Sequence, residues 1–295
     1  MKPTKRILLT GANGQVGWEL RRTLACVGEV VAMDAEDMDL ADAGAVRRVV
    51  REQAPNIIVN SAAYTAVDTA ESEVEKAHAI NAVAPGILAS EAERLGAMLV
   101  HYSTDYVFDG SGAAPWQEGD APNPLNVYGA SKLAGEQAVQ SACRRHLIFR
   151  TSWVYGGRGA NFLLTMRRLI RQRPELKIVA DQVGAPTWSR MLAEATAQIV
   201  AQQILLTGED SRSPSWGLYH MSNAGETSWH GFAEAIQELD PPDQPAHLQP
   251  IPSSEYPTPA KRPLNSRLDN ERLATTFGLR LPHWRHALKL CLDET

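Results

Sequence analysis

Short apolar runs alternate with helical patterns along the first 150 residues, and this alternation constrains the fold more than any other feature. Strands separated by helices of this length form right-handed βαβ units. The sequence therefore predicts an α/β protein with a doubly wound parallel sheet. The expected strands are Arg6–Thr10, Glu29–Met33, Asn56–Asn60, Met98–Ser103 and His146–Arg150, and the expected helices between them are Gln15–Ala25, Ala43–Gln53, Ala79–Leu95 and Val127–Ser141.

The alternation loosens after residue 155, which predicts a second, smaller α/β lobe over the carboxyl edge of the sheet. We expect helices over Asn161–Arg173 and Ser189–Leu206 and a strand over Leu176–Val179. Residues 207–217 and 240–263 are rich in Pro, Ser, Asp and Gly and are interpreted as loops. The predicted domains are residues 1–155, which the chain rejoins around 176–207, and residues 156–295.

Charge and cysteine content exclude several classes of function. The net charge of −5 argues against a nucleic-acid or anionic-membrane surface. The chain has no apolar run long enough to span a bilayer, and its basic N-terminus leads into a strand rather than a signal peptide. Cys26, Cys143 and Cys291 have no paired spacing for disulfides or zinc. We therefore expect a soluble cytoplasmic protein with reduced thiols.

Three glycines lie between the first expected strand and the first expected helix. Gly11, Gly14 and Gly17 allow the backbone to approach a pyrophosphate, and the helix N-terminus supplies amide donors and positive potential. A purely structural turn is the alternative, but the position between strand and helix favours a dinucleotide site of Rossmann type. We assign Asn13, Gln15 and Val16 of the same turn to this site.

Other strand ends supply further candidate cofactor contacts. Asp34 follows the second strand, where a carboxylate would bind the adenosine ribose and favour NADH over NADPH. A helix-capping or loop aspartate is an equally good interpretation of Asp34. The remaining candidates are Asp39 and Leu40 over the adenine, the small residues Ala62 and Ala63 with Tyr64 after the third strand, and Tyr102 in the fourth.

Tyr128 and Lys132 are four residues apart in an expected helix, so their side chains share one face. An adjacent ammonium favours the phenolate, which predicts a lowered tyrosine pKa and a usable acid–base group. Thr104 ends the fourth strand, where ligands bind in open α/β sheets, and could donate to a substrate oxygen. A surface Tyr–Lys pair and a packing threonine are the alternatives. Because the glycine turn and these residues can converge on one crevice, we favour catalysis.

These residues resemble the extended, sugar-nucleotide-modifying branch of the short-chain dehydrogenase/reductase superfamily, and within it the family of dTDP-4-dehydrorhamnose reductases. The resemblance extends over essentially the whole chain. The segments that carry it are Gly14–Leu20, His101–Phe108, Pro124–Gly129, Ile148–Tyr155, Asp181–Thr187, Gly217–His220 and Tyr256–Leu268.

The resemblance implies hydride transfer from NADPH or NADH to C4 of dTDP-4-dehydro-β-L-rhamnose. It implies that Tyr128 is the proton donor and that Lys132 binds the nicotinamide ribose. Thr104 would bind the sugar oxygen at the reacting carbon. The resemblance also places a dTDP-sugar substrate against Asp105, Trp153, Arg262 and Asn265, of which the last two could equally be part of a solvated basic loop.

Some similar enzymes dimerise around Mg²⁺ held by three glutamates, and the resemblance places Glu19 and Glu294 at two of those positions. Arg190 occupies the third, and a guanidinium cannot ligate a cation. We therefore predict that no metal is bound. A homodimer joined by pairs between Arg190 and glutamates and a monomer both remain open.

Three other functions compete with the reductase. A dehydratase would need an acid–base pair after the threonine, but Thr104 is followed by Asp105 and Tyr106, so the second carboxylate is missing. An epimerase is harder to exclude. A non-catalytic regulatory subunit with a reductase-like fold is the third alternative, and intact Thr104, Tyr128 and Lys132 argue against it.

Overall fold

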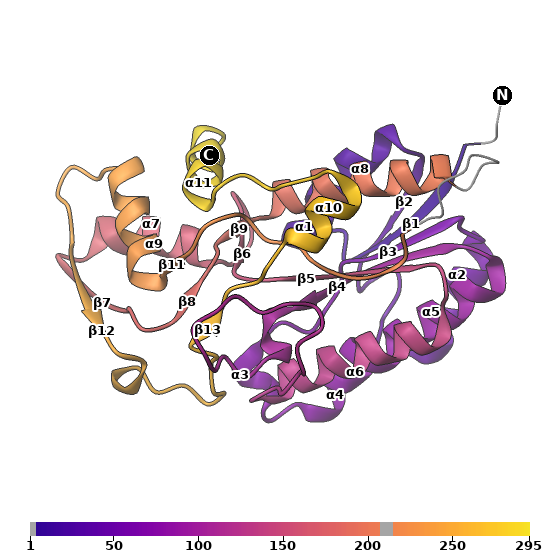
Figure 1. Ribbon diagram of the computed structural model, residues 1–295, viewed down its shortest axis with the longest axis horizontal. Coiled ribbons are helices and arrows are strands. Elements are labelled where there is room, and N and C mark those ends of the chain that lie inside the picture. Colours follow the sequence, from indigo (N-terminus) through magenta and orange to yellow (C-terminus); the bar gives the residue numbers. More distant parts are fainter. Residues whose placement is uncertain (1–3, 207–214) are drawn as a thin grey trace.

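In the computed structural model, which describes residues 4–206 and 215–295, a parallel sheet forms the centre of the molecule (Figure 1). Over those residues the sheet has six strands in the order β10-β5-β4-β3-β1-β2. The chain reverses direction across the sheet between β1 and β3, which is the switch point where doubly wound folds bind ligands. The predicted fold class is confirmed. The strands are β1 (Arg6–Thr10), β2 (Glu29–Met33), β3 (Ile57–Asn60), β4 (Met98–Thr104), β5 (His146–Thr151) and β10 (Gly217–His220).

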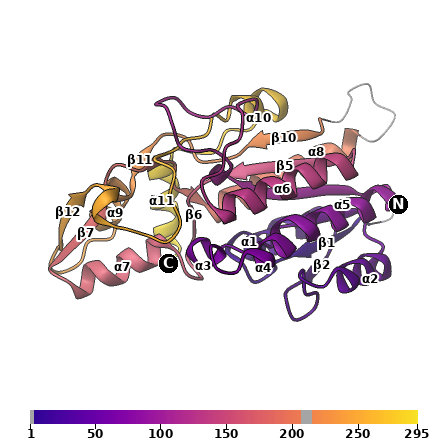
Figure 2. The same ribbon diagram turned by 90° about the horizontal axis from the view of Figure 1, so that it is seen from below.

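Alternate residues of each strand pack into two separate hydrophobic cores. Ile7 and Leu9 face a core with Leu20 and Leu192, whereas Leu8 faces a core with Val46 and others. Helices therefore cover both faces of the sheet, as continuous apolar strands require. One face is covered by α1 (Gln15–Thr23) and α8 (Ser189–Leu206), and the other by α2 (Ala43–Gln53), α5 (Ala84–Leu95) and α6 (Val127–Ala142) (Figures 1 and 2).

The helix expected over Ala79–Leu95 begins earlier and is interrupted by a wider turn. Two short helices, α3 (Val67–Ala70) and α4 (Val74–His78), precede the π-helical segment Ala79–Val83, which leads into α5. The wide turn contains Asn81, whose side-chain amide donates to Ser131 on α6 at 3.0 Å and bonds both backbone groups of Tyr64. Such π segments concentrate at functional sites, and this one ties the loop after β3 to α6.

The smaller lobe has its own core, in which Tyr155, Phe232 and Trp284 are buried. It contains α7 (Phe162–Gln172), α9 (Trp229–Leu239) and α11 (Trp284–Asp293), with α10 (Glu271–Phe277) nearer the sheet (Figure 2). Two adjacent strands, β7 (Glu175–Val179) and β12 (His247–Ile251), pair in parallel. The short strands are β6 (Val154–Tyr155), β8 (Val183–Gly184), β9 (Thr187–Trp188), β11 (Thr227–Ser228) and β13 (Asn265–Ser266).

Two segments interpreted as loops contain strands. The loop over 240–263 contains β12, which was missed because Pro250 lacks an N–H and reduces strand propensity, although an edge strand tolerates it. The loop over 207–217 ends at β10, which pairs with β5 and completes the sheet. Residues 207–214 lie outside the described residues.

The chain returns to the sheet through α8, which packs against α1, whereas β7 stays in the smaller lobe with β12. The division into domains at residue 155 stays a prediction. Among the described residues, no helix is both long and apolar enough to cross a membrane.

Candidate active site

The glycine turn after β1 is held by two close backbone approaches. Gly11 has φ of +69°, and a Cβ there would lie 2.8 Å from the backbone of Ala62. A Cβ on Gly17 would lie 2.0 Å from the carbonyl oxygen of Gly11. The turn therefore requires glycine at both positions, Gly11 for its left-handed conformation and Gly17 for the contact of α1 with the turn.

A cavity of about 570 Å³ opens at the carboxyl ends of β1 to β5. Thr10, Met33 and Thr151, the last residues of β1, β2 and β5, line it, and the N-terminus of α1 faces it. Its position at the switch point and its glycine cradle fit a dinucleotide. The predicted cofactor residues that line it are Gly11, Asn13, Gly14, Gln15, Val16, Asp34, Asp39, Leu40, Ala62, Ala63, Tyr102 and Lys132.

Two predicted cofactor residues do not line this cavity. Gly17 lies behind the turn, against Gly11, and Tyr64 directs its hydroxyl to Glu73, to which it donates at 3.2 Å. Ser103 and Thr151 line the cavity but were not predicted, although both lie at strand ends where the same rule applies. Val154, Gly159 and Ala160 also line it, and no local pattern indicates that their loop reaches the glycine turn.

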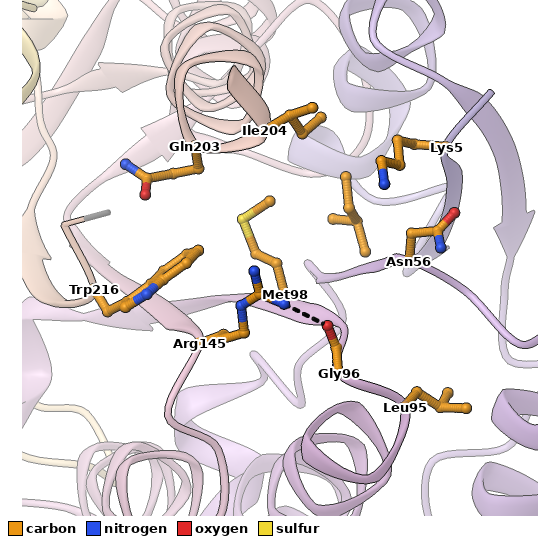
Figure 3. A pocket seen from close by; sticks show the side chains of 10 residues that line it. Lys5, Asn56, Leu95, Gly96, Met98, Arg145, Gln203, Ile204 and Trp216 are labelled. Carbon is orange, nitrogen blue, oxygen red and sulfur yellow. Dashed lines mark hydrogen bonds between the residues drawn. The ribbon is translucent and has the colours of Figure 1, made fainter. Parts of the chain in front are cut away.

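A second, smaller cavity lies at the opposite end of the sheet (Figure 3). It measures about 90 Å³ and is lined by residues at the amino ends of strands, among them Lys5, Asn56 and Met98. Arg145 there donates to the carbonyl oxygen of Gly96 at 2.8 Å. Ligands of open α/β sheets bind at the carboxyl ends, so this cavity is not the candidate active site.

Tyr128 and Lys132 lie side by side in the first two turns of α6 and both line the 570 Å³ cavity. Asn126 caps the helix, accepting from the backbone N–H of Gly129 at 2.8 Å. The Thr104 hydroxyl group, at the end of β4, lies near the Tyr128 phenol and acts to lower the pKa of Tyr128. The three residues predicted to be catalytic are therefore brought together at the end of β4.

The predicted lowering of the pKa of Tyr128 is wrong for this structure. Burial raises the pKa of Tyr128 to about 12, an effect that the nearby Thr104 hydroxyl group only partly offsets. The ammonium of Lys132 instead donates to the carbonyl oxygen of Tyr102 at 2.6 Å. Burial lowers the pKa of Lys132 to about 8. The tyrosine is thus a protonated phenol beside a cation that loses its proton in mildly alkaline solution.

Asp105 is a buried carboxyl group directly after Thr104. Burial raises the pKa of Asp105 to about 7, against hydrogen bonds from Ser266 and Thr104. Thr104 donates to Oδ1 of Asp105 at 3.1 Å, whereas Oδ2 has no partner among the described residues. An unpaired buried oxygen beside the Tyr128 hydroxyl group is suited to bind a polar ligand group.

A larger cavity of about 930 Å³ lies between the lobes and is lined by Tyr106, Arg262 and Trp229. The ring of Tyr106 packs edge-on against Tyr128, which lines the 570 Å³ cavity, with centroids 5.5 Å apart, so this pair of rings lies between the two cavities. Arg262 donates to Asp68 at 2.7 Å and keeps its Nη1 unpartnered among the described residues. This cavity therefore offers a cationic group to an anionic ligand close to the Tyr106–Tyr128 ring pair.

Of two further residues predicted to contact the substrate, Trp153 lies next to the larger cavity and Asn265 does not. Trp153 has φ of +49° and stacks on Trp229, which lines the larger cavity, with ring centroids 3.7 Å apart. Such strain in a non-glycine residue is common at functional sites. Asn265 lies away from both cavities, because its amide donates to Ala114 at 2.8 Å and its oxygen accepts from Arg267.

Arg190 on α8 lies between two glutamates. Its Nε donates to Glu19 at 2.7 Å and its Nη1 to Glu294 at 3.1 Å. The described residues contain no group of three His, Cys, Asp or Glu side chains that could hold a metal ion. A guanidinium in this position repels a cation, so these residues do not fit Mg²⁺.

We expect a chelator to leave both the activity and the oligomeric state unchanged, because Arg190 already forms ion pairs with Glu19 and Glu294. Activity assays and size-exclusion chromatography with and without EDTA measure this. Dissociation by EDTA that Mg²⁺ reverses would contradict the prediction.

Comparison with known proteins places this site in a family. The model of the RmlD substrate binding domain matches residues 5–295. The dTDP-4-dehydrorhamnose reductase of Burkholderia thailandensis is 50% identical over 98% of both chains. That of Escherichia coli K12 is 47% identical over 98% of this chain and 97% of its own. This chain belongs to the dTDP-4-dehydrorhamnose reductase family.

The solved structures agree with this membership. The crystal structure of dTDP-4-dehydrorhamnose reductase from Bacillus anthracis in complex with NADP has a TM-score of 0.92 and 36% sequence identity. It covers 99% of this chain, and this chain covers 100% of it. As a member of this reductase family, the chain is an oxidoreductase that uses a nicotinamide cofactor.

Proposed function

We propose that the protein reduces dTDP-4-dehydro-β-L-rhamnose to dTDP-β-L-rhamnose, the last step of dTDP-rhamnose biosynthesis. The observation that carries the proposal is that Tyr128 and Lys132 lie together in the wall of the cavity, with Thr104 near the Tyr128 phenol. This is the arrangement that protonation of a ketone oxygen requires. Similarity to reductases of that name over nearly the whole chain supports the choice of substrate.

A reduced nicotinamide bound in the 570 Å³ cavity would supply the hydride that adds to C4. Tyr128 then gives its proton to the C4 oxygen, and the product is an alcohol. The pKa of about 12 keeps the phenol protonated at neutral pH, so Tyr128 is ready as a donor. Thr104 orients the same oxygen. Lys132, at the floor of the cavity, stabilises the phenolate that forms and binds the nicotinamide ribose.

The sugar nucleotide would occupy the 930 Å³ cavity, with its sugar at Tyr128. Asp105 offers its unpartnered Oδ2 to a sugar hydroxyl, and Trp153 covers the sugar from the stack with Trp229. Arg262 offers its free Nη1 to the diphosphate. Asn265 would contribute to substrate binding only indirectly, because its side chain donates to Ala114 and orders the loop around it.

A spectrophotometric assay tests the proposal. The purified protein is mixed with NADPH and the 4-keto sugar nucleotide, and the nicotinamide absorbance is followed. We expect oxidation of NADPH in proportion to the ketone consumed. Interconversion of sugar epimers without net oxidation would favour an epimerase, and binding without any turnover would favour a regulatory subunit.

We further propose that NADH binds at least as tightly as NADPH. Asp34 and Asp39 line the adenosine end of the cavity, and Lys132, at the other end, is the only basic residue among the described ones that line it. Asp34 accepts from the backbone of Ala35 at 2.9 Å, so its carboxylate is held in place against a 2′-phosphate.

We expect Ala35→Arg to tighten NADPH binding relative to NADH by about tenfold, roughly one charge-assisted hydrogen bond. Ala35 is exposed and lines the cavity, so a guanidinium there can reach a 2′-phosphate. Fluorescence titration gives the two dissociation constants. Ala41→Arg adds the same charge outside the cavity lining and should leave the ratio unchanged. An equal response of both variants would contradict a local contact.

A further inference from the structure

Glu136 lies on the same face of α6 as Tyr128 and Lys132, at successive spacings of four residues. Its residue surface is 1% exposed, so its carboxylate is removed from water. A buried charge of this kind is costly unless it is paired and hydrogen-bonded. The proposed reduction gives Glu136 no role, so its presence on α6 next to the active-site residues needs an explanation.

Glu136 is fully engaged by two neighbours. Arg150 on β5 donates from Nε to Oε1 at 2.8 Å and from Nη2 to Oε2 at 2.6 Å, a bidentate pair between two buried side chains. Ser103 on β4 donates to Oε1 at 2.5 Å. Ser103 stands between Tyr102, whose carbonyl oxygen accepts from Lys132, and the catalytic Thr104. The carboxylate is therefore fixed in position from two strands.

Lys132 depends on this carboxylate electrostatically. Its side chain is buried, which lowers its pKa, and Glu136 acts in the opposite direction and raises it. Lys132 holds one hydrogen bond, to Tyr102, and forms no ion pair within 4.0 Å in the described part of the chain. Glu136 is thus the anion that favours the ammonium form.

The other titratable groups near this part of α6 do not replace Glu136. His101 on β4 is neutral, because burial and Lys132 both lower its pKa. Arg150 is a cation and opposes a second positive charge. The titratable and charged groups on the packed elements are Tyr128 on α6, His101 and Tyr102 on β4, His146 and Arg150 on β5, Asp105 and Tyr106 after β4, Asp68 on α3, Glu75, Lys76 and His78 on α4, and Glu91, Glu93 and Arg94 on α5.

We propose that Glu136 is a positioning residue of the reductase, which keeps Lys132 charged and directed at the Tyr102 carbonyl, with Arg150 and Ser103 fixing the carboxylate. This proposal rests on the function proposed above. Stability alone does not account for the arrangement, because buried ion pairs can often be replaced by apolar side chains without loss of stability. The ion pair instead brings a carboxylate to the face of α6 that carries Lys132, one helical turn away, and keeps the balancing cation of Arg150 on β5.

The test compares Glu136→Gln and the double variant Glu136→Gln/Arg150→Met with the unchanged enzyme. The double variant leaves no unpaired buried guanidinium, so it separates folding from electrostatics. Glu91→Gln is the matched control, since Glu91 is also a buried glutamate, 5% exposed, paired with Arg51 and Arg94 but on α5. The measurements are the pH profile of kcat/KM and the ¹⁵N NMR titration of the Lys132 ammonium, assigned with Lys132→Arg.

We expect the alkaline limb of the profile and the Lys132 titration to move down by about one pH unit in Glu136→Gln. The shift should be smaller in the double variant, which also loses the opposing cation of Arg150. The sign follows from the charge, since losing an anion favours the neutral amine, which then forms at lower pH. Glu91→Gln should keep the midpoint of the unchanged enzyme. A uniform loss of activity with an unchanged midpoint would overturn the proposal. An enzyme that never turns over refutes the proposed function instead, and the NMR titration still decides the role of Glu136.

Discussion

The Tyr128→Phe variant is expected to lose at least about a hundredfold in kcat, the usual scale for an acid–base group, while binding the dinucleotide normally. The substitution removes the hydroxyl group near Thr104 and leaves the ring that packs edge-on against Tyr106. Cofactor contacts from the glycine turn and from Lys132 stay in place. Steady-state kinetics with the sugar nucleotide and fluorescence titration with NADPH measure the two effects.

Tyr155→Phe provides the control for this variant. Tyr155 is buried in the core of the smaller lobe, and its hydroxyl group has no partner among the described residues. Removing that group should leave kcat close to that of the unchanged enzyme. Near-normal turnover in Tyr128→Phe would exclude Tyr128 as the proton donor and would turn attention to Asp105, the nearby carboxyl group with a pKa of about 7.

The Gly17→Ala variant is expected to lose on the order of 2 to 3 kcal/mol of unfolding free energy, the range of an overpacked contact. The added methyl group would lie 2.0 Å from the carbonyl oxygen of Gly11, and backbone cannot move aside as a side chain can. The start of α1 must shift away from the turn, so dinucleotide affinity should fall at least about tenfold as well. Urea unfolding and NADPH titration test both expectations.

Gly44→Ala is the matched control, since Gly44 also lies in the first turn of a helix. The nearest atom to its added methyl group is the side-chain oxygen of Asp42 at 3.2 Å, which caps α2 and has to give by only a few tenths of an ångström. Because alanine favours a helix over glycine by up to about 1 kcal/mol, this variant should be neutral or more stable. A Gly17→Ala protein as stable as Gly44→Ala would show that α1 does not depend on the close contact.

The chain segments with local periodicity were predictable from sequence. Ile7 to Leu9 alternate between two cores in a strand that ends at Gly11, and apolar residues recur at helical spacing in α1 and α2. The spacing of Tyr128 and Lys132 likewise placed them on one face before any tertiary contact was known. Strands with a weak or contradictory pattern were not predictable from sequence. One example is β12, which contains Pro250 and is defined by its long-range pairing with β7.

Sequence by itself determined the parallel sheet, the glycine turn and the helical Tyr–Lys pair, because each depends on residues a few positions apart. Only the tertiary structure decided how those groups ionise. Burial raises the pKa of Tyr128, and Lys132 donates to the carbonyl oxygen of Tyr102. Glu136 on α6 pairs with Arg150 on β5. The physical reason is that spacing fixes which side chains share a face, whereas loss of water and the sum of nearby charges depend on every segment packed around them.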